Sequence, residues 1–246
     1  MTVLTFDTLQ DLQIALDSDQ GPKGRITQAY VADQTVWIKR PEVLPLRMRL
    51  QKGDPVRAFA AEQSAHKRFA DQNLPVPPLL LTASTYTVTA NIGGNLAEVM
   101  RTHPQKQSAD LITMAALALA QFHNAGTYHG RPNLKDICWD GTDIRFIDFE
   151  RAGKHSPEKG MAEDVIMFVF NIFAEAQGDY APLPDVMYAY RQDAPNDVFQ
   201  NAAKRAARFR HLSWLTWPIR QKKRAWEFKA IPRTLAFFRN KNPQSS

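Results

Sequence analysis

The order in which strand-like and helix-like patterns follow one another is the feature that most limits the fold of this chain. The first third alternates apolar and polar residues over short runs, with one helical pattern among them, whereas the later part reads mainly as helices. The predicted strands span 25–31, 35–39, 79–81 and 86–89, and the helix among them spans 54–71. Strands followed by helices indicate an α+β fold and exclude an alternating, doubly wound sheet.

A glycine-containing segment at 90–96 separates the two patterns and is the best boundary between lobes. Beyond it we expect a helix that Ser108 caps and that ends near Gly126, and another over about Glu163–Gln177. Segments 137–139 and 144–147 lie between these helices and predict a hairpin. The expected organisation is a strand-rich N-lobe at 1–89, a hinge at 90–96, a helical C-lobe at 97–200 and a basic, aromatic, helical C-terminal extension at 201–246.

Composition limits the class of protein. The chain has 246 residues, of which 44% are hydrophobic and 23% charged, and these values are typical of a folded rather than a disordered protein. A single cysteine, Cys138, excludes a disulfide framework and a cysteine-rich zinc site, and we expect it to fill a small buried strand position. Residues 1–16 lack a secretory-signal pattern, and the most apolar run, 165–174, is too short to span a bilayer, so we expect a cytoplasmic protein.

Positive charge is concentrated near the C-terminus. The net charge of the whole chain is +6, but segment 204–241 holds twelve Lys or Arg residues and one acid, Glu227. Aromatic residues are interleaved with these cations, namely Trp214, Trp217, Trp226, Phe228, Phe237 and Phe238. The mixture fits three interpretations. The rings could pack on the helical lobe with the charges outside, or the segment could contact the anionic inner face of a membrane peripherally. Binding of single-stranded nucleic acid fits least well.

Four charged residues could form a phosphate-handling site. Asp136 and Asp148 flank the predicted hairpin, so their carboxylates can converge at one end of it and hold a hydrated divalent ion. Lys39 lies on a strand with apolar neighbours, and Glu62 shares one helix face with Phe59, His66 and Phe69. A Lys–Glu pair can steady an ammonium group that is directed at phosphate.

Each of these residues also has an ordinary structural interpretation. Lys39 and Glu62 could be solvated surface charges, and Asp136 and Asp148 could cap turns. Arg131 could be another surface charge. The functional interpretation depends on the whole set occurring in a particular order along the chain.

That order resembles the motifs of the protein-kinase-like superfamily, above all its bacterial lipopolysaccharide core (Kdo/heptose) kinases and aminoglycoside-type phosphotransferases. The matching segments are Val36-Trp-Ile-Lys39, Glu62, the hinge at 90–96, His129-Gly130-Arg131 with Asp136-Ile137, Asp148-Phe149-Glu150, and Asp164. The resemblance covers roughly residues 25–178.

The resemblance implies a bilobal fold and a phosphotransferase that uses ATP and Mg²⁺. It assigns nucleotide binding to Lys39, Glu62, Ala90 and Ile92, metal binding to Asp136 and Asp148, and bracing of the catalytic-type loop to His129 and Asp164. The implied acceptor is a hydroxyl group on a sugar, a glycolipid or a lipopolysaccharide-type molecule, and a protein acceptor stays open.

The chain departs from the family pattern at its most important acid. Arg131 stands where the family has its catalytic aspartate, and arginine cannot act as a general base. In addition, Asp136 replaces an asparagine, Glu150 replaces a glycine, and Gly21 and Gly24 only partly replace a glycine-rich loop. Two functions therefore remain open: a phosphotransferase in which Arg131 stabilises charge on the transferring group, and a pseudokinase that binds nucleotide or acts as a scaffold.

Overall fold

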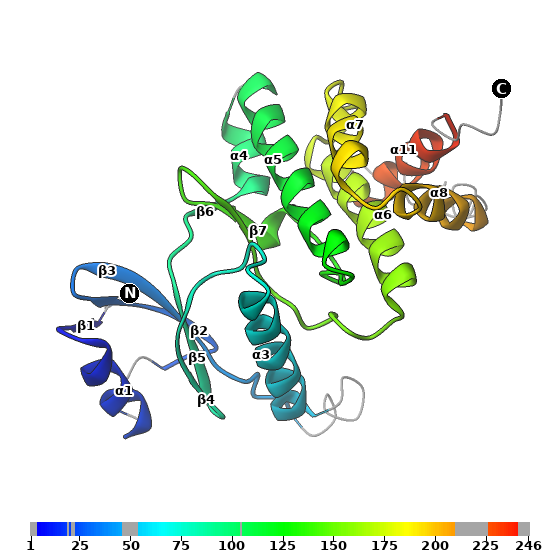
Figure 1. The fold of residues 1–246 in the computed structure, drawn as a ribbon. Coiled ribbons are helices and arrows are strands. Elements are labelled where there is room, and N and C mark those ends of the chain that lie inside the picture. Colours follow the sequence, from blue (N-terminus) through cyan, green and yellow to red (C-terminus); the bar gives the residue numbers. More distant parts are fainter. Residues whose placement is uncertain are drawn as a thin grey trace. The chain divides into compact units, whose positions relative to one another are not determined.

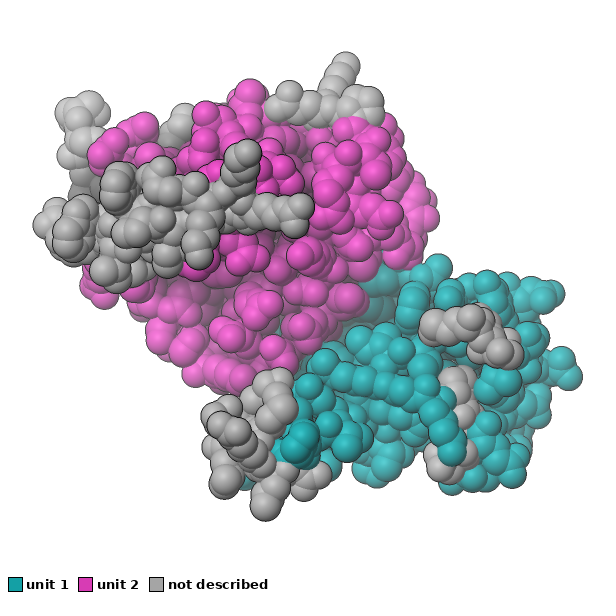
Figure 2. Space-filling view, turned by 180° about the vertical axis from the view of Figure 1, so that it is seen from behind, with its two compact units in different colours: residues 1–92 teal, residues 93–246 magenta. Residues whose placement is uncertain are grey.

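The computed structural model describes residues 4–18, 20, 23–45, 54–103, 105–209 and 226–240, and it has an α+β fold. Contacts within the chain divide it into two compact units, residues 1–92 and 93–246, which are coloured separately in Figure 2. The division falls inside the glycine-containing segment 90–96. Each unit is described by itself below.

Unit 1 is built on a mixed five-stranded sheet in the order β1-β2-β3-β5-β4 (Figure 1). The strands are β1 (Leu4–Phe6), β2 (Ile26–Val31), β3 (Gln34–Lys39), β4 (Leu79–Ala83) and β5 (Tyr86–Ala90). Strand β1 pairs with β2 in parallel, and the other neighbours are antiparallel. The hairpin predicted from 25–31 and 35–39 is therefore present, and so are the strands predicted at 79–81 and 86–89.

The two faces of this sheet contact different helices. Helix α1 (Leu9–Asp17), which begins with a capping box at Thr8, covers one face, where Leu12 packs with Ile38 and Val88. Successive strand residues point to opposite faces. Lys39, next to Ile38, therefore lies on the other face, toward helix α3 (Pro55–Asp71).

Helix α3 begins where the sequence predicted. The Asp54 carboxylate accepts a hydrogen bond from the Val56 N–H at 3.0 Å, and Pro55 occupies the first helical turn, where its missing N–H costs nothing. Its predicted inward face is confirmed, because Phe59, His66 and Phe69 are buried and Glu62 is largely covered. The helix ends at Asp71, ahead of the proline-rich segment 74–78.

Unit 2 contains most of the helices and a short three-stranded sheet in the order β6-β7-β8. The helices are α4 (Leu96–Thr102), α5 (Gln105–Asn124), α6 (Pro157–Glu175), α7 (Leu183–Asp193), α8 (Val198–Arg208) and α11 (Trp226–Asn240), and the strands are β6 (Gly94–Asn95), β7 (Ile137–Trp139) and β8 (Ile144–Phe146). The hairpin predicted at 137–147 corresponds to β7 and β8, which pair antiparallel.

Two predicted helix starts were wrong. Helix α5 begins at Gln105, so Ser108 lies inside it, 2% exposed and 3.4 Å from the Tyr180 hydroxyl, and it is not the cap. Helix α6 begins at Pro157 rather than Glu163 and ends at Glu175. Proline favours the first turn of a helix, and this local preference outweighs the weak apolar pattern of residues 157–162.

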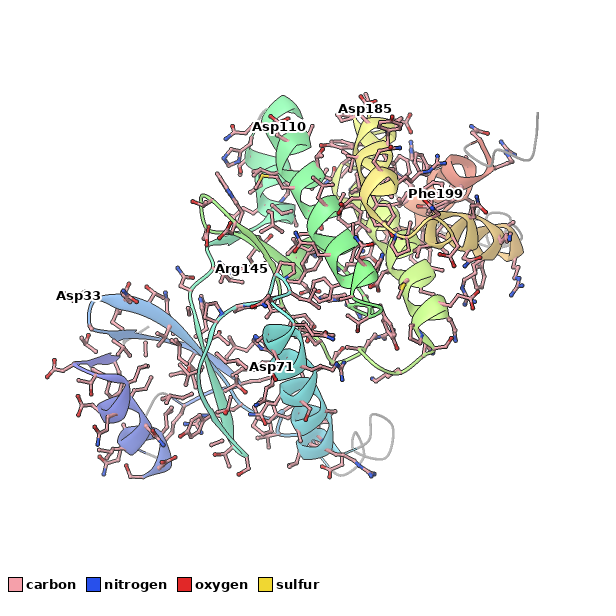
Figure 3. All side chains as sticks on the ribbon, in the orientation of Figure 1. Asp33, Asp71, Asp110, Arg145, Asp185 and Phe199 are labelled. Atoms are coloured by element: carbon pink, nitrogen blue, oxygen red, sulfur yellow. The ribbon has the colours of Figure 1, made fainter. Side chains whose placement is uncertain are left out.

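Some aromatic residues of the C-terminal segment pack inside unit 2. Phe237 and Phe238 of α11 lie with their ring centroids 6.5 and 5.5 Å from that of Phe199 on α8, which Figure 3 labels. Packing therefore accounts for these two rings, whereas Phe228 stays 37% exposed. Trp214 and Trp217 lie outside the described residues, and contact of 204–241 with an anionic membrane stays a prediction. Within the described ranges, no helix has the length and apolar character needed to cross a bilayer.

Candidate functional site

In unit 1 the predicted partners Lys39 and Glu62 form an ion pair. The Lys39 Nζ on β3 contacts Glu62 Oε1 on α3, and the side chains are 26% and 14% exposed. Partial burial makes such a pair stronger than a surface one, because less water screens it. The arrangement presents a positioned ammonium group on the α3 side of the sheet.

His66 supports this pair from the next turn of α3. Its Nε2 lies 2.8 Å from the Pro77 carbonyl oxygen, which accepts the hydrogen bond and ties α3 to the proline-rich segment. Burial, and to a smaller extent the charge of Lys39, lowers the pKa of His66 below its usual value. The ring is therefore neutral near pH 7 and adds no second positive charge beside Lys39.

Ala90 and Ile92, the predicted hinge residues, end unit 1. The Ala90 N–H donates to the Pro78 carbonyl at 3.1 Å, and Ile92 is 6% exposed. Between them, Asn91 is joined to β3 twice: its N–H donates to the Thr35 carbonyl at 3.2 Å, and its Oδ1 accepts from Trp37 Nε1 at 3.0 Å. The segment is thus anchored to the strand that carries Lys39.

In unit 2, Asp164 of α6 holds the loop that follows α5. Its carboxylate accepts hydrogen bonds from the His129 N–H at 2.6 Å and the Gly130 N–H at 2.8 Å, and the residue is 0% exposed. Hydrogen bonds to a charged acceptor are stronger than neutral ones. The bracing contact expected between Asp164 and this loop is present.

His129 connects the same loop to the hairpin. Its Nε2–H donates to the Ile147 carbonyl at 2.9 Å, and its Nδ1 accepts from the Arg131 N–H at 3.3 Å. These two contacts require a neutral ring with the proton on Nε2. Burial lowers the pKa of His129, although the nearby Asp164 opposes this effect, so the neutral form agrees with the hydrogen bonds. His129 therefore braces the loop, as expected.

Asp136 and Asp148 lie at the same end of the β7–β8 hairpin. Ile137 pairs with Phe146, and one position further out the Ile147 N–H donates to the Asp136 carbonyl at 2.9 Å. Both aspartates are half-buried. The hairpin thus brings the backbones of these residues together, as its sequence predicted.

The backbone of Asp148 is unusual. Its φ is +70°, a left-handed conformation that costs a non-glycine residue about 1–3 kcal/mol. The following residue, Phe149, is 2% exposed, and its ring centroid lies 5.3 Å from that of His129. The buried Phe149 ring thus packs beside the turn, and residues with such backbone conformations cluster at functional sites.

A pair of carboxylates is a ligand set typical of Mg²⁺, which also binds substrate phosphates and water. The described part of the chain contains no cluster of three or more His, Cys, Asp or Glu residues that could hold a metal ion. Mg²⁺ is usually bound through one or two carboxylates together with substrate phosphates and water. Asp136 and Asp148 are therefore the residues that could hold a magnesium ion arriving with a nucleotide.

Arg131 follows Gly130 at the exposed side of the loop. Gly130 has a φ of +100°, and a Cβ atom there would lie 2.6 Å from the backbone carbon of Arg151. Only glycine allows this close approach, which brings the 149–152 turn against the loop. Arg151 on this turn is exposed, as are Lys154 just after it and Lys135 on the loop.

A buried contact behind the loop was not predicted. His123, which the sequence suggested only as a packed residue at a helix end, lies with Nδ1 2.6 Å from the Tyr190 hydroxyl and Nε2 3.6 Å from Asp164 Oδ2. Burial raises the pKa of Tyr190 well above its usual value, so its hydroxyl keeps its proton. The only early signal was a histidine near the end of an apolar helix, and nothing in the sequence pointed to Tyr190.

Cys138 has no role in this chemistry. It is 7% exposed on β7, and burial raises the pKa of its thiol to about 11. The thiol is therefore protonated and unreactive near pH 7, which confirms the expected structural role.

Comparison with known proteins adds little about activity. No family model matches the chain. An uncharacterized protein of Haemophilus influenzae is 27% identical over 187 residues, which cover 75% of this chain and 77% of that protein.

Proposed function

We propose that this protein is an ATP- and Mg²⁺-dependent phosphotransferase with a bilobal, protein-kinase-like fold, similar to the lipopolysaccharide core kinases and aminoglycoside-type phosphotransferases. The observation that carries the proposal is the ion pair between Lys39 on β3 and Glu62 on α3. A lysine paired in this way is suited to bind phosphate oxygens.

Each site residue has a definite role in the proposal. Lys39 binds the α- and β-phosphates, Glu62 orients it, and the 90–92 segment contacts the base of the nucleotide. Asp148 is the main ligand of Mg²⁺ and Asp136 the second. The metal ion, when bound, neutralises phosphate charge as the phosphoryl group transfers.

The loop bracing supports the same function. Phosphoryl transfer depends mainly on positioning and on charge stabilisation. Asp164 holds the backbone N–H groups of His129 and Gly130, and the His129 ring holds the Ile147 carbonyl, through hydrogen bonds of 2.6–2.9 Å. This rigidity keeps Asp148 and the segment that carries Arg131 in a constant arrangement.

Arg131 determines what kind of transferase this would be. Its guanidinium group stays protonated, so in this proposal it stabilises negative charge on the transferring group instead of accepting a proton. Arg151 and Lys154 add further exposed positive charge beside this loop, whereas Lys135 lies with its Nζ 3.8 Å from Glu175 Oε1. This charge favours a hydroxyl acceptor on an anionic sugar or glycolipid over a polycationic acceptor.

A pseudokinase is the second candidate, and Arg131 is the observation that favours it. In that case the protein binds nucleotide, or acts as a scaffold, without transferring phosphate. Nucleotide binding alone does not separate the two candidates, whereas ATP consumption in the presence of an acceptor extract does.

The first experiment measures thermal unfolding with ATP, with and without Mg²⁺. Ligand at 100 times its dissociation constant stabilises a protein by about 2.7 kcal/mol, which corresponds to a rise in the melting temperature of roughly 5–10 °C for a chain of this size. We expect this rise only when Mg²⁺ is present. Lys39→Met and Asp148→Asn should abolish it, whereas Asp136→Asn should keep much of it because asparagine retains an oxygen ligand.

Lys67→Met is the matched control for the lysine variant. Lys67 lies on α3 with a side chain 72% exposed, and its Nζ is 4.0 Å from Asp71. Its removal should leave the Mg·ATP response unchanged. A wild-type response in both Lys39→Met and Asp148→Asn would show that these residues do not bind the nucleotide, and would reject the proposed site.

A further inference from the structure

Gln63, the residue after Glu62, makes a polar side-chain contact between α3 and the sheet of unit 1. Its Nε2 lies 2.8 Å from the Ala83 carbonyl oxygen, 3.0 Å from the Tyr86 carbonyl oxygen and 2.8 Å from Thr87 Oγ1. Two of these neighbours can only accept a hydrogen bond, so the atom that faces them is the amino nitrogen of the amide. Gln63 therefore fastens α3 to the end of β4 and the start of β5.

The strand pairing places this contact next to the Lys39–Glu62 pair. Lys39 of β3 and Thr87 of β5 are directly opposite each other in the ladder. Glu62 contacts the first and Gln63 the second. Two consecutive side chains of α3 thus hold two paired residues of the sheet.

This geometry restrains rotation of the helix. Consecutive residues of an α-helix project about 100° apart around its axis. Rolling α3 in either direction would therefore stretch the contact of Glu62 or that of Gln63. The hydrogen bond from His66 to the Pro77 carbonyl restrains the helix again, one turn further on.

We infer that Gln63 is a positioning residue that keeps the Lys39–Glu62 pair assembled when no nucleotide is bound. The inference rests on the proposed function for its importance to nucleotide binding, but the contact itself can be tested without nucleotide. It implies that α3 is a fixed part of the phosphate-binding half-site and does not switch activity by moving away from Lys39. Nothing in the sequence distinguished Gln63 from a surface residue.

The test compares the wild type with variants of the full-length protein. The measured quantity is the rate at which an amine-acylating reagent modifies Lys39, determined by peptide mass spectrometry. An amine held in a partly buried ion pair reacts slowly. Gln63→Met keeps the length of the side chain but removes its donor, and we expect it to raise the Lys39 rate about tenfold and to weaken Mg·ATP binding by a similar factor. Ser64→Ala, which removes only a hydrogen bond to Ala60 within the exposed part of the helix, should keep the wild-type rate.

A second control separates positioning from general loosening of the fold. Phe69 is 0% exposed on α3 and takes no part in the contacts of Glu62 and Gln63 with the sheet. Phe69→Leu therefore weakens the core while leaving Gln63 in place. We expect Phe69→Leu to leave the Lys39 rate near that of the wild type. An equal acceleration in Phe69→Leu, or a wild-type rate in Gln63→Met, would overturn the inference.

Two further outcomes are also decisive. If Gln63→Met does not fold, Thr87→Val takes its place, because it removes one of the three acceptors near Gln63 Nε2. An increase of about twofold in the rate of Lys39 acylation supports the positioning role, and a wild-type rate rejects it. If Gln63→Met accelerates acylation but the wild-type protein binds no nucleotide, the positioning role stands and the proposed function fails.

Discussion

Asp164→Asn replaces one oxygen of a fully buried carboxylate with an amino group and should loosen the loop at residues 129–136. The wild-type carboxylate accepts one hydrogen bond from the His129 N–H and one from the Gly130 N–H. An asparagine can accept only one of them. Its amino group would then face the other N–H, which leaves a buried donor without an acceptor.

The expected loss of stability follows from these two bonds. A hydrogen bond to a charged group contributes about 1.5–3 kcal/mol, and a buried donor left without a partner costs about 1–3 kcal/mol. The neutral amide is easier to bury than the carboxylate, which offsets part of this loss. We therefore expect the free energy of unfolding to fall by about 3 kcal/mol, a large share of the 5–15 kcal/mol typical of folded proteins.

Urea unfolding followed by circular dichroism measures this change, and thermal unfolding with Mg·ATP measures its effect on the site. Glu158→Gln is the matched control, because it makes the same carboxylate-to-amide change on the exposed first turn of α6. Its effect should stay within about 0.5 kcal/mol. If Asp164→Asn unfolds within the same margin of the wild type, the two hydrogen bonds do not hold the loop and the argument is refuted.

Two further predictions concern charge. If the protein transfers phosphate, Arg131→Ala should lower ATP turnover at least tenfold. Arg131→Asp should not restore turnover, because a negative charge there repels the γ-phosphate. Wild-type turnover in Arg131→Ala would remove Arg131 from the mechanism. Burial lowers the pKa of both His66 and His129 from 6.5, so below pH 6.5 the unfolded chain binds more protons than the folded one. Stability should therefore decrease as the pH falls from 7 to 5.5, and a flat profile over this range in urea unfolding would contradict the assignment.

The parts of the fold that could be predicted are those with local signals. The β2–β3 hairpin follows from strict alternation around a short turn, and Ala32 and Asp33 do adopt the positive φ values that such turns need. Asp54 and Pro55 mark the start of α3 because capping depends on neighbouring residues only. Helix α1 and strand β1 were not predicted: β1 has only three residues, and the capping box formed by Thr8 and Asp11, a local signal for the start of α1, was missed.

In the candidate site, too, the residues could be predicted from the sequence, whereas their contacts were seen only in the structure. The residues Lys39, Glu62, Asp136, Asp148 and Asp164 could be selected from the sequence, because their order and spacing along the chain carry the signal. The structure then added that Lys39 contacts Glu62 and that Asp164 accepts hydrogen bonds from the loop. The roles of these residues in nucleotide and metal binding stay predictions.

What the sequence by itself determined is the α+β class, the local elements and the identity of the charged candidates, because neighbouring residues encode turns, caps and periodicity. Only the tertiary structure decided that Gln63 reaches Thr87 across 24 positions of the chain and that Tyr190 reaches His123 across 67. Such partners depend on how distant elements pack, and no local preference of glutamine or tyrosine specifies them. The left-handed backbone of Asp148 was also seen only in the structure, because aspartate tolerates this conformation better than most residues but does not require it.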